Sequence, residues 1–520
     1  MPGSSNSRGW LIVLLLLIAL FVRIHNVTAL PPFNDESLHI RRAEIAWSFD
    51  DLNISLKPGK LLTYYWIGLF NADRLHGIFL GRTVVGIFSL LGLAGLYAAA
   101  RRLFSAWGGI LALYIAVFSP FMIFFDRLAF SDPLASALGM LTVWGSLLMV
   151  RHPEEWEWGI LTGFLGGLTT LAKLIGAPYI VVPVLAIFLL SGLGWRVAWK
   201  RYKTTLIVCY VTFSVVLLPF FAYVAYKEVS YQRSPDANPA AERAVMVEPV
   251  LINTRSPLET IVDNIQDIVT VNWVLHGGLV LTLGGLLITF RVRPRTFLFL
   301  LGCIVLPWSI VIFLAGRFST RYVQLGILPL LIVMAGVLII GFQKLPERWK
   351  SLRSWAGSWL VVSVWIVFFA QPFIAAAWTN PREMTLPKTD RHEYFQNFTS
   401  GYALMDAAEL AKNLEPSTRS GRIPVIGLVG SCHQMRLYLD ENGPVNLECP
   451  NFGWEGELMP DVSRHIEQRL QQEGVLYVFA EPELDILDFD LLTVDHRVIA
   501  RFGRPFDGMV VEVWEMESAQ

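Results

Sequence analysis

The chain has 520 residues, of which 54% are hydrophobic and only 16% are charged, and its formal net charge is −1. This composition, with a mean hydropathy of +0.49, excludes an ordinary soluble globular protein, and the near-neutral charge gives no reason to expect nucleic-acid binding. The four cysteines are too few for a disulfide scaffold and lack the spacing of metal ligands. Long uncharged apolar runs instead indicate a polytopic membrane protein.

The first apolar run, 10–22, has two interpretations. It is short for a membrane span, and Val27-Thr28-Ala29 resembles a cleavage site, so one interpretation is a removed signal peptide. The interpretation we favour is a signal-anchor helix that continues through Arg23. The long side chain of Arg23 would then snorkel to the far membrane surface.

Two adjacent carboxylates, Asp35 and Glu36, follow this run at the head of a polar loop, 31–77. Adjacent acids repel each other, which raises one pKa toward a value useful for proton transfer. The same residues also suit a helix start, with Asn34 or Asp35 as the N-cap and Glu36 in the first turn, where negative charge is favourable. The local sequence leaves both interpretations open.

Further apolar runs predict membrane helices, about eleven in all with the first run. They cover residues 78–98, 107–125, 132–150, 158–172, 174–193, 204–226, 274–290, 297–315, 323–342 and 354–377. The segment 227–273 is predicted to be a second large loop, either a cap on the membrane surface or a simple linker.

Lysine and arginine in short loops predict the orientation of a membrane protein. With a cytoplasmic N-terminus, the inside loops hold Arg101, Arg102, Arg151, Arg196, Lys200, Arg201, Lys203, Arg291, Arg293, Arg295, Lys344, Arg348, Lys350 and Arg353. This pattern predicts a multi-pass protein of the cytoplasmic (plasma) membrane. It places outside the cytoplasm the 31–77 loop, the 126–131 turn, the 227–273 loop and everything after about 378.

From residue 378 to 520 the composition becomes that of a soluble domain. Strand-like runs occur at 425–429, 475–479 and 509–513, and helix-like runs at 403–414 and 462–473. We therefore expect a transmembrane domain at 1–377 followed by a small extracytoplasmic α/β domain. Cys432 and Cys449 lie in this second domain and can pair if it faces an oxidising space.

Ionisable residues within or beside membrane spans are functional candidates, because charge is costly in hydrocarbon. The candidates at the predicted outer face are Arg82, Arg127, Asp132, Lys173, Arg317, Arg321 and the adjacent Tyr322. Singly, each has an ordinary explanation, either interfacial snorkelling or an internal ion pair such as Arg127 with Asp132. Together with Asp35 and Glu36 they predict a site whose cations hold a lipid-linked phosphate while a carboxylate takes a proton from an incoming hydroxyl. That chemistry is sugar transfer from a polyprenyl-phosphate donor.

In order and spacing, these residues resemble membrane glycosyltransferases of the GT-C fold, in the branch of the protein O-mannosyltransferases and the lipid A aminoarabinose transferases. The resemblance covers roughly residues 10–345, and its motifs are Asn34-Asp35-Glu36, Arg82-Thr83-Val84-Val85, Ser119-Pro120 through Arg127 and Asp132-Pro133, Gly167-Leu168 through Lys173, and Arg321-Tyr322 with Pro329. The chain departs from the family at His39, where many members have tyrosine, and at Lys57-Pro58-Gly59-Lys60-Leu61, where His-Pro-Pro is expected.

The resemblance implies an inverting glycosyltransferase that moves a monosaccharide from polyprenyl phosphate to an acceptor hydroxyl of a protein, a lipid or a cell-envelope glycan. It implies that Asp35 is the general base and that Glu36 supports it or holds the acceptor. It implies that Asp132 orients the site, and that a divalent ion, which only some members use, would be held by Asp132 or Glu36. The implied donor-phosphate ligands are Lys173, Arg321 and Tyr322, with Arg82 and Arg127 as secondary contacts. We add Arg317 as a further candidate for the donor phosphate, and His39 and Lys60 as candidate loop or acceptor contacts.

Three other functions stay open at this stage. A lipid-linked oligosaccharide polymerase or ligase would use the same donor class but transfer a whole chain. A transporter or flippase for the lipid-linked sugar is disfavoured, because we find no internal repeat and the ionisable residues lie at one face rather than at the midplane. A sensor that binds through the C-terminal domain has no local motif in its favour.

Overall fold

The computed structural model describes residues 5–518 except 51, 57–58, 71–75, 234–255, 345–354, 418, 441, 451–459, 485–491 and 493. The chain divides into two compact units. Unit 1 consists of Met1–Val27, Ile45–Leu69 and Arg82–Pro387, and unit 2 consists of Thr28–Glu44, Phe70–Gly81 and Lys388–Gln520.

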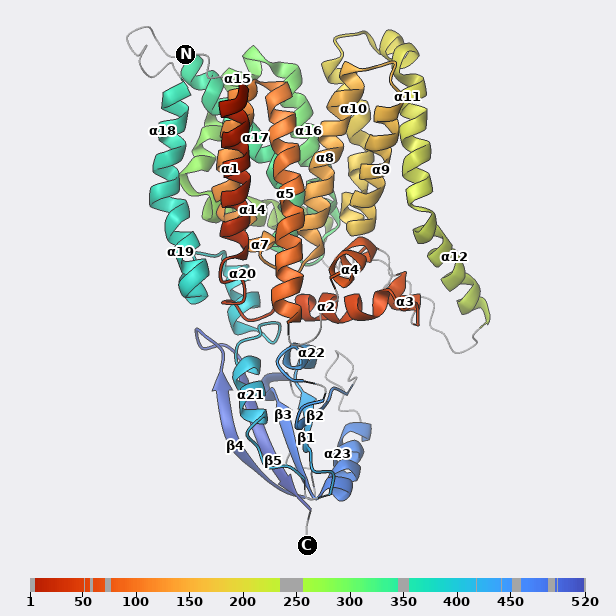
Figure 1. Cartoon of the computed structure of the whole chain (residues 1–520), viewed down its shortest axis with the longest axis vertical. Coiled ribbons are helices and arrows are strands. Elements are labelled where there is room, and N and C mark those ends of the chain that lie inside the picture. The colour runs from red at the N-terminus through yellow and green to blue at the C-terminus, as the bar shows by residue number, and fades with distance from the viewer. Residues whose placement is uncertain are drawn as a thin grey trace. The chain divides into compact units, whose positions relative to one another are not determined.

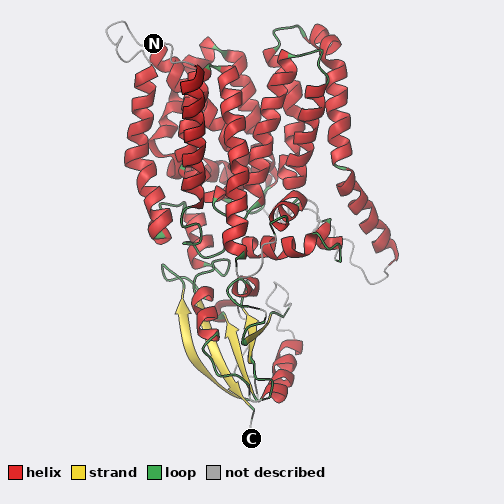
Figure 2. Cartoon of the chain, in the orientation of Figure 1, coloured by secondary structure: helices red, strands yellow, loops and turns green. Residues whose placement is uncertain are grey.

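Unit 1 is helical (Figures 1 and 2). Its α-helices are α1 (Ser5–Ile24), α3 (Leu52–Ser55), α4 (Leu61–Gly68), α5 (Gly77–Leu103, whose first residues belong to unit 2), α6 (Ala106–Phe118), α7 (Pro120–Asp126), α8 (Ser131–Arg151), α9 (Glu157–Ala172), α10 (Val182–Leu190), α11 (Trp195–Val216), α12 (Leu218–Arg233), α14 (Pro257–His276), α15 (Leu286–Val292), α16 (Pro294–Leu314), α17 (Gln324–Gln343), α18 (Trp355–Trp365) and α19 (Gln371–Thr379). Short 3₁₀ or π segments, η1 (Leu174–Val181), η3 (Gly277–Gly285), η4 (Thr320–Val323), η6 (Ile366–Ala370) and η7 (Pro381–Glu383), connect several of them.

Within the described residues, seven helices are long and apolar enough to cross a membrane, or up to nine if each of two bent pairs forms one span. The bent pairs are α6 with α7, at 59°, and α11 with α12, at 44°. Two runs counted among the roughly eleven predicted spans, α9 with 16 residues and Leu174–Leu190, are helical but shorter than these spans. The polytopic helical fold expected from the apolar runs is therefore present.

The prediction that 227–273 is a loop is wrong at both ends. At the N-terminal end α12 continues to Arg233, and at the C-terminal end α14 begins at Pro257 and continues helically through η3 and α15 to Val292. Ser256 and Glu259 form a capping box: the Ser256 hydroxyl accepts the Glu259 N–H, and the Glu259 carboxylate accepts the Ser256 N–H, both at 3.3 Å. The sequence Ser-Pro-Leu-Glu at 256–259 is a signal for the start of a helix, which the sequence analysis did not recognise. Residues 234–255 of this segment lie outside the described residues.

Arg23 does not snorkel to a membrane surface, as the sequence analysis expected, but is fully buried against Asp126. Its Nε donates to Asp126 Oδ2 at 2.9 Å, and the Gln324 amide donates to Asp126 Oδ1 at 2.9 Å. A buried cation needs a counter-charge more than a route to water, and Asp126 supplies one across 103 residues of sequence. Because Arg23 belongs to α1 and Asp126 is the last residue of α7, the ion pair connects these two helices.

The ion pair between Arg127 and Asp132, which the sequence analysis gave as an example of an ordinary explanation, is also not formed. Arg127 instead donates to backbone carbonyl oxygens at 2.8–3.4 Å. Four of them, those of Val22, Arg23, His25 and Asn26, lie at the end of α1 or just after it, and the fifth, that of Ala377, lies in α19. The last carbonyls of a helix have no partner within the helix, and an arginine fork satisfies several at once. Arg127 therefore anchors the C-terminal end of α1.

Unit 2 contains a five-stranded sheet with the order β2-β1-β3-β5-β4 (Figures 1 and 2). The strands are β1 (Ile423–Leu428), β2 (Val445–Glu448), β3 (Val475–Ala480), β4 (Asp495–Gly503) and β5 (Val510–Glu517); β1 is parallel to β2 and β3, and β5 is antiparallel to β3 and β4. The helical elements of this unit are most of α2 (Asn34–Ala46), α20 (Lys388–Arg391), η8 (His392–Gln396), α21 (Leu404–Ala411), α22 (Cys432–Arg436), α23 (Pro460–Glu473) and η9 (Pro482–Leu484).

Apolar side chains cover the sheet of unit 2 on both faces. Ala407 and Ala411 of α21 belong to one buried cluster with Val425, whereas Ile466 and Leu470 of α23 belong to another. β1 is buried along its whole length, as expected of a central parallel strand. The predicted α/β domain is thus confirmed, and its three predicted strands and two predicted helices are all present.

We predict that Arg23→Met lowers stability by about 3 kcal/mol, because it leaves the Asp126 carboxylate buried without its cation. The measurement is the thermal unfolding midpoint of the full chain in detergent, with exposed Arg196→Met on α11 as the control. The double variant Arg23→Met with Asp126→Leu should recover most of the loss, since an apolar pair replaces an ion pair. A single variant as stable as the wild type would contradict the structural role of the pair.

Candidate functional site

One candidate site lies in unit 1, where an ion pair joins two helix ends. Lys173 Nζ lies 2.6 Å from Asp132 Oδ1, and both side chains are almost completely buried. Asp132 is in the first turn of α8, where the helix dipole favours a carboxylate, and Lys173 follows the last residue of α9 in an extended conformation. The sequence predicted both residues as site members, and the structure brings them together across 41 residues.

Two aromatic rings and a second cation complete this cluster. The Lys173 ammonium lies 4.4 Å from the centre of the Tyr322 ring, and the Arg321 guanidinium lies 4.7 Å from the Phe130 ring and 5.5 Å from the Tyr322 ring. Aromatic faces attract cations and fix their orientation. Arg321 is partly exposed, whereas Lys173 and Tyr322 are buried. We call Phe130, Asp132, Lys173, Arg321 and Tyr322 the cation cluster.

Phe130 is the member of the cation cluster that the sequence analysis missed. It immediately precedes α8, in the segment Phe130-Ser131-Asp132-Pro133 that had already been singled out for its acid. An aromatic residue among many in an apolar chain carries no signal of its own. The role of Phe130 becomes visible only in the structure, where η4 places the Arg321 guanidinium over the Phe130 ring.

The remaining predicted cations of unit 1 do not join the cation cluster through the contacts described. Arg82 is buried and donates to the carbonyl of Val27 at 2.8 Å, so it lies with Arg127 around the end of α1. Arg317 is exposed before η4, and Lys60 is half-buried at the start of α4. Roles for these four residues at a donor phosphate or in acceptor binding stay predictions.

A separate candidate site lies in unit 2, at the start of α2. This helix begins at Asn34, so Asp35 and Glu36 both lie in its first turn. Glu36 is completely buried, and its carboxylate accepts the N–H of Phe33 at 2.9 Å. The helix-start interpretation thus holds for Glu36, which closes the first turn in the manner of a capping-box glutamate. Asp35 is only half-buried, and His39, one turn later, is buried.

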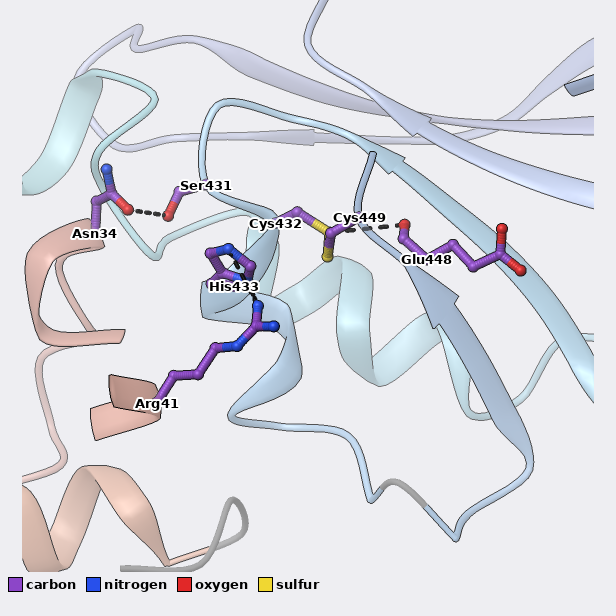
Figure 3. The surroundings of a disulfide bond; sticks show 7 residues. All are labelled: Asn34, Arg41, Ser431, Cys432, His433, Glu448 and Cys449. Carbon is purple, nitrogen blue, oxygen red and sulfur yellow. Dashed lines mark hydrogen bonds between the residues drawn. A yellow bond between two sulfur atoms is a disulfide. The ribbon is translucent and has the colours of Figure 1, made fainter. Parts of the chain in front are cut away.

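The start of α2 is held by residues of α22 and of the loop before it (Figure 3). The Ser431 hydroxyl donates to the Asn34 side chain at 2.7 Å, and one Arg41 nitrogen lies 2.7 Å from His433 Nδ1. The Gln434 amide donates to the carbonyls of Pro32 and Thr399 at 2.6 and 2.8 Å. The backbone on both sides of Asp35 is therefore fixed by partners that no local motif indicated.

A disulfide between Cys432 and Cys449 joins α22 to the end of β2 (Figure 3). The pairing that the sequence analysis raised for these two cysteines is thus present. The bond limits the movement of α22, and α22 carries His433 and Gln434 toward α2.

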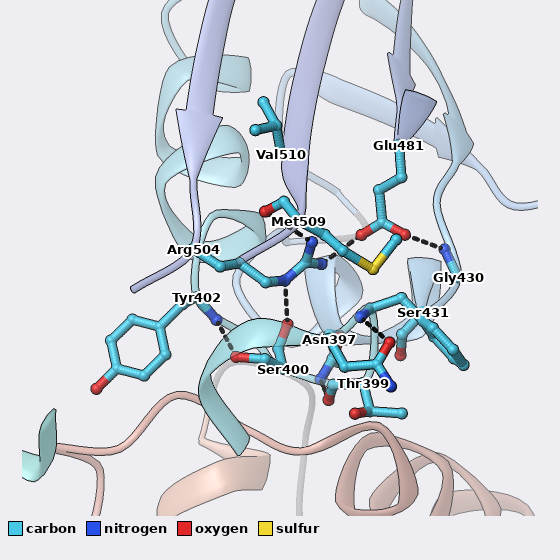
Figure 4. A network of polar contacts seen from close by, with 12 residues as sticks. Asn397, Thr399, Ser400, Tyr402, Gly430, Ser431, Glu481, Arg504, Met509 and Val510 are labelled. Carbon is cyan, nitrogen blue, oxygen red and sulfur yellow. Dashed lines mark hydrogen bonds and ion pairs between the residues drawn. The ribbon is translucent and has the colours of Figure 1, made fainter. Parts of the chain in front are cut away.

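A buried ion pair stabilises the loop before α22 (Figure 4). Arg504 and Glu481 are in direct contact, and both side chains are fully buried. Glu481 also accepts the N–H of Gly430 at 2.9 Å, and Arg504 Nε donates to the carbonyl of Ser400 at 3.3 Å. Burial raises the pKa of Glu481, while Arg504 opposes that shift. The network therefore connects Gly430, in the loop before α22, to Ser400, in the loop before α21.

The carboxylates present do not form a metal site in the described part of the chain. Asp132 is engaged with Lys173, Glu36 closes the first turn of α2, and no group of three or more histidine, cysteine, aspartate or glutamate residues there has the arrangement to hold a metal ion. We therefore derive no chemical step through a metal.

Residues 58–223 match the sequence model of a known family, dolichyl-phosphate-mannose-protein mannosyltransferase. This match covers about a third of the chain and includes Arg82, Arg127, Asp132 and Lys173. No curated protein is similar enough in sequence to count as a relative.

Solved structures similar to this chain share its fold over almost its whole length. ArnT from Cupriavidus metallidurans bound to undecaprenyl phosphate is 17% identical, with a TM-score of 0.61 over 97% of this chain and 98% of that one. Its apo state is 19% identical, with a TM-score of 0.59 over 98% of both chains. The apo oligosaccharyltransferase of Archaeoglobus fulgidus is 13% identical, with a TM-score of 0.54 over 92% of this chain and 70% of that one. The GT-C fold predicted from the motifs is thereby confirmed.

The contact between α2 and α22 predicts a pH dependence of stability. Burial, assisted by Arg41, lowers the pKa of His433 from 6.5 to about 4. Between these two values the unfolded chain binds more protons than the folded chain, so stability should fall as the pH drops from about 6.5 toward 4. His433→Gln should flatten this part of the profile, measured as thermal midpoints of the full chain between pH 4 and 7. His465→Gln on α23 is the control; identical wild-type and His433→Gln profiles would disprove the assignment.

Proposed function

We propose that the protein is an inverting glycosyltransferase that moves a monosaccharide from a polyprenyl-phosphate donor to an acceptor hydroxyl. The observation that carries this proposal is the cation cluster, in which Lys173 and Arg321 are oriented by Asp132 and two aromatic rings. The likeness in fold to ArnT, whose structure contains undecaprenyl phosphate, supports the donor class. The match to the mannosyltransferase family over 58–223 supports sugar transfer.

In this proposal the cation cluster binds the donor phosphate. Lysine provides a compact positive charge and arginine a planar fork of donors, which together suit a phosphate. Asp132 holds the Lys173 ammonium in position before the lipid arrives, so little reorganisation is needed when the bond breaks. Arg321, being partly exposed, is the group that meets the phosphate first.

Asp35 is the proposed general base. It takes the proton of the acceptor hydroxyl while the hydroxyl oxygen attacks the anomeric carbon. The bond between that carbon and the phosphate oxygen breaks on the opposite side, and the phosphate leaves with the electron pair, stabilised by Lys173 and Arg321. Attack opposite the leaving group inverts the anomeric configuration. We assign Glu36 a supporting role, because its carboxylate is buried and already accepts a backbone N–H.

The proposed location is the outer face of the membrane, with a cytoplasmic N-terminus and unit 2 outside. The arrangement of arginine and lysine in the short loops supports this orientation. The disulfide of unit 2 supports it independently, because such bonds persist in oxidising compartments and are rare in the cytosol.

A second candidate is a ligase that transfers a whole oligosaccharide from the lipid. The likeness in fold to the oligosaccharyltransferase of Archaeoglobus fulgidus favours it, since that protein shares the architecture over 92% of this chain. The two candidates use the same acid and cations and differ in what the lipid carries. The size of the transferred product distinguishes them.

We predict that Asp35→Asn lowers transfer by about 100-fold or more, because an amide does not accept the hydroxyl proton. Membranes that contain wild type or variant are incubated with radiolabelled polyprenyl-phosphate monosaccharides, and the label that leaves the lipid is counted. Exposed Asp50→Asn, later in the same segment of chain, is the matched control and should transfer normally. An active Asp35→Asn enzyme would remove Asp35 from the mechanism.

We predict that Arg321→Gln weakens binding of undecaprenyl phosphate by about tenfold, because it removes a charge-assisted contact. We choose Arg321 because it is partly exposed, so its substitution should affect folding little. Lys173→Gln would also leave the buried Asp132 carboxylate without its cation and so destabilise the fold. Binding is measured by native mass spectrometry, with Asp35→Asn as the control that should bind the lipid normally. Equal affinity of Arg321→Gln and wild type would exclude the cation cluster as the phosphate site.

A further inference from the structure

A second basic site lies in unit 1, at the ends of four helices. A cavity of about 500 Å³ is bounded by the last turns of α5 and α8, the end of α10 and the first turn of α16. Its lining residues are Arg101, Arg102, Leu103, Leu147, Val150, Arg151, Leu190 and Thr296. We call this cavity the arginine pocket.

The arginine pocket is separate from the cation cluster. Asp132 lies in the first turn of α8 and Arg151 in its last turn. At about 1.5 Å per residue, the 21 residues of this helix place the two roughly 30 Å apart, close to the thickness of the hydrocarbon core. The pocket therefore lies toward the opposite membrane surface, which the charge pattern assigns to the cytoplasm.

Three like charges meet at this pocket, and none of its lining residues is acidic. Arg101 and Arg151 are both close enough to Arg102 to act on its charge. Cations in the last turn of a helix are ordinary, because they complement the helix dipole. Here, however, the arginines at the ends of α5 and α8 line the same cavity and repel one another, and a bound anion would reduce this repulsion.

Arg102 is held in place independently of any ligand. Its guanidinium donates to the Ala98 carbonyl at 3.0 Å and lies 5.7 Å from the centre of the Trp144 ring. These contacts orient the guanidinium at the pocket wall. Arg101 and Arg151 are exposed, so they are accessible to a ligand that enters from the membrane surface.

The remaining wall is aliphatic, formed by Leu103, Leu147, Val150 and Leu190. A free inorganic anion gains nothing from such a wall, whereas a phospholipid places its headgroup phosphate among cations and its acyl chains against apolar side chains. Three of the four helices, α5, α8 and α16, are themselves apolar enough to span the membrane, so lipid surrounds this end of the unit.

We propose that the arginine pocket binds the phosphate of an anionic phospholipid headgroup at the membrane surface opposite to the donor site. Arg101, Arg102 and Arg151 hold the phosphate, Thr296 supplies a hydroxyl, and the four aliphatic side chains contact the beginning of the acyl chains. The proposal does not depend on the glycosyltransferase activity.

The test is native mass spectrometry of the purified full chain with phosphatidylglycerol, with zwitterionic phosphatidylethanolamine as the comparison lipid. Arg101→Gln with Arg151→Gln should weaken phosphatidylglycerol binding by about 25-fold, at roughly fivefold per cation. The matched control is Arg196→Gln with Arg201→Gln, two exposed arginines of α11 that are predicted at the same surface and do not line the pocket. The control should bind phosphatidylglycerol as wild type does.

Three further measurements separate loss of lipid binding from loss of folding and identify the bound anion. Thermal midpoints of all variants show whether they are folded, and the charge-conserving pair Arg101→Lys with Arg151→Lys should retain most of the binding. Competition with inorganic phosphate identifies the source of the anion. The proposal is overturned if the glutamine pair binds phosphatidylglycerol like the wild type, if phosphatidylethanolamine binds equally well, or if inorganic phosphate displaces the lipid at comparable concentration.

Discussion

The cost of placing charge in hydrocarbon governs the helical unit. Its buried cations in the described residues are each matched, Arg23 by Asp126, Lys173 by Asp132, and Arg82 and Arg127 by backbone carbonyls. Each of these contacts joins segments far apart in the sequence, so the need to neutralise a charge also fixes which helix ends meet. The positions of α1, α7, α8 and α9 follow from this pairing as much as from apolar packing.

Two buried ion pairs in this unit have similar chemistry and different surroundings. The pair of Arg23 and Asp126 is completely enclosed, and a glutamine amide takes the remaining carboxylate oxygen. The pair of Lys173 and Asp132 lies instead beside two aromatic rings and a partly exposed arginine. An enclosed pair only holds the fold together. A pair beside an accessible cation is already arranged for an anionic ligand, which is why we place the donor phosphate there.

The sequence predicted most of the fold and part of the site, for identifiable reasons. Long apolar runs reveal membrane helices directly, and costly ions such as Lys173 and Asp132 reveal a site because few explanations exist for them. The partner of a charge is a different matter: the counter-ion of Arg23 and the carbonyls around Arg127 depend on how helices cross. β2 was missed because it has only four residues. β4 was missed because none of its residues is fully buried, so it lacks the continuous apolar run by which the other strands were predicted. The contacts of α22 with α2 have no local signal.

The contacts around Asn34 have a consequence for the order in which the protein can be completed. Asn34 is synthesised early, yet Ser431 follows it by 397 residues, and Gln434 follows Pro32 by 402. Loops of that length close only after nearly the whole chain has left the ribosome. The cation cluster, by contrast, is finished once Tyr322 has been made. The contacts around Asn34 therefore form only after the residues of the cation cluster have all been made.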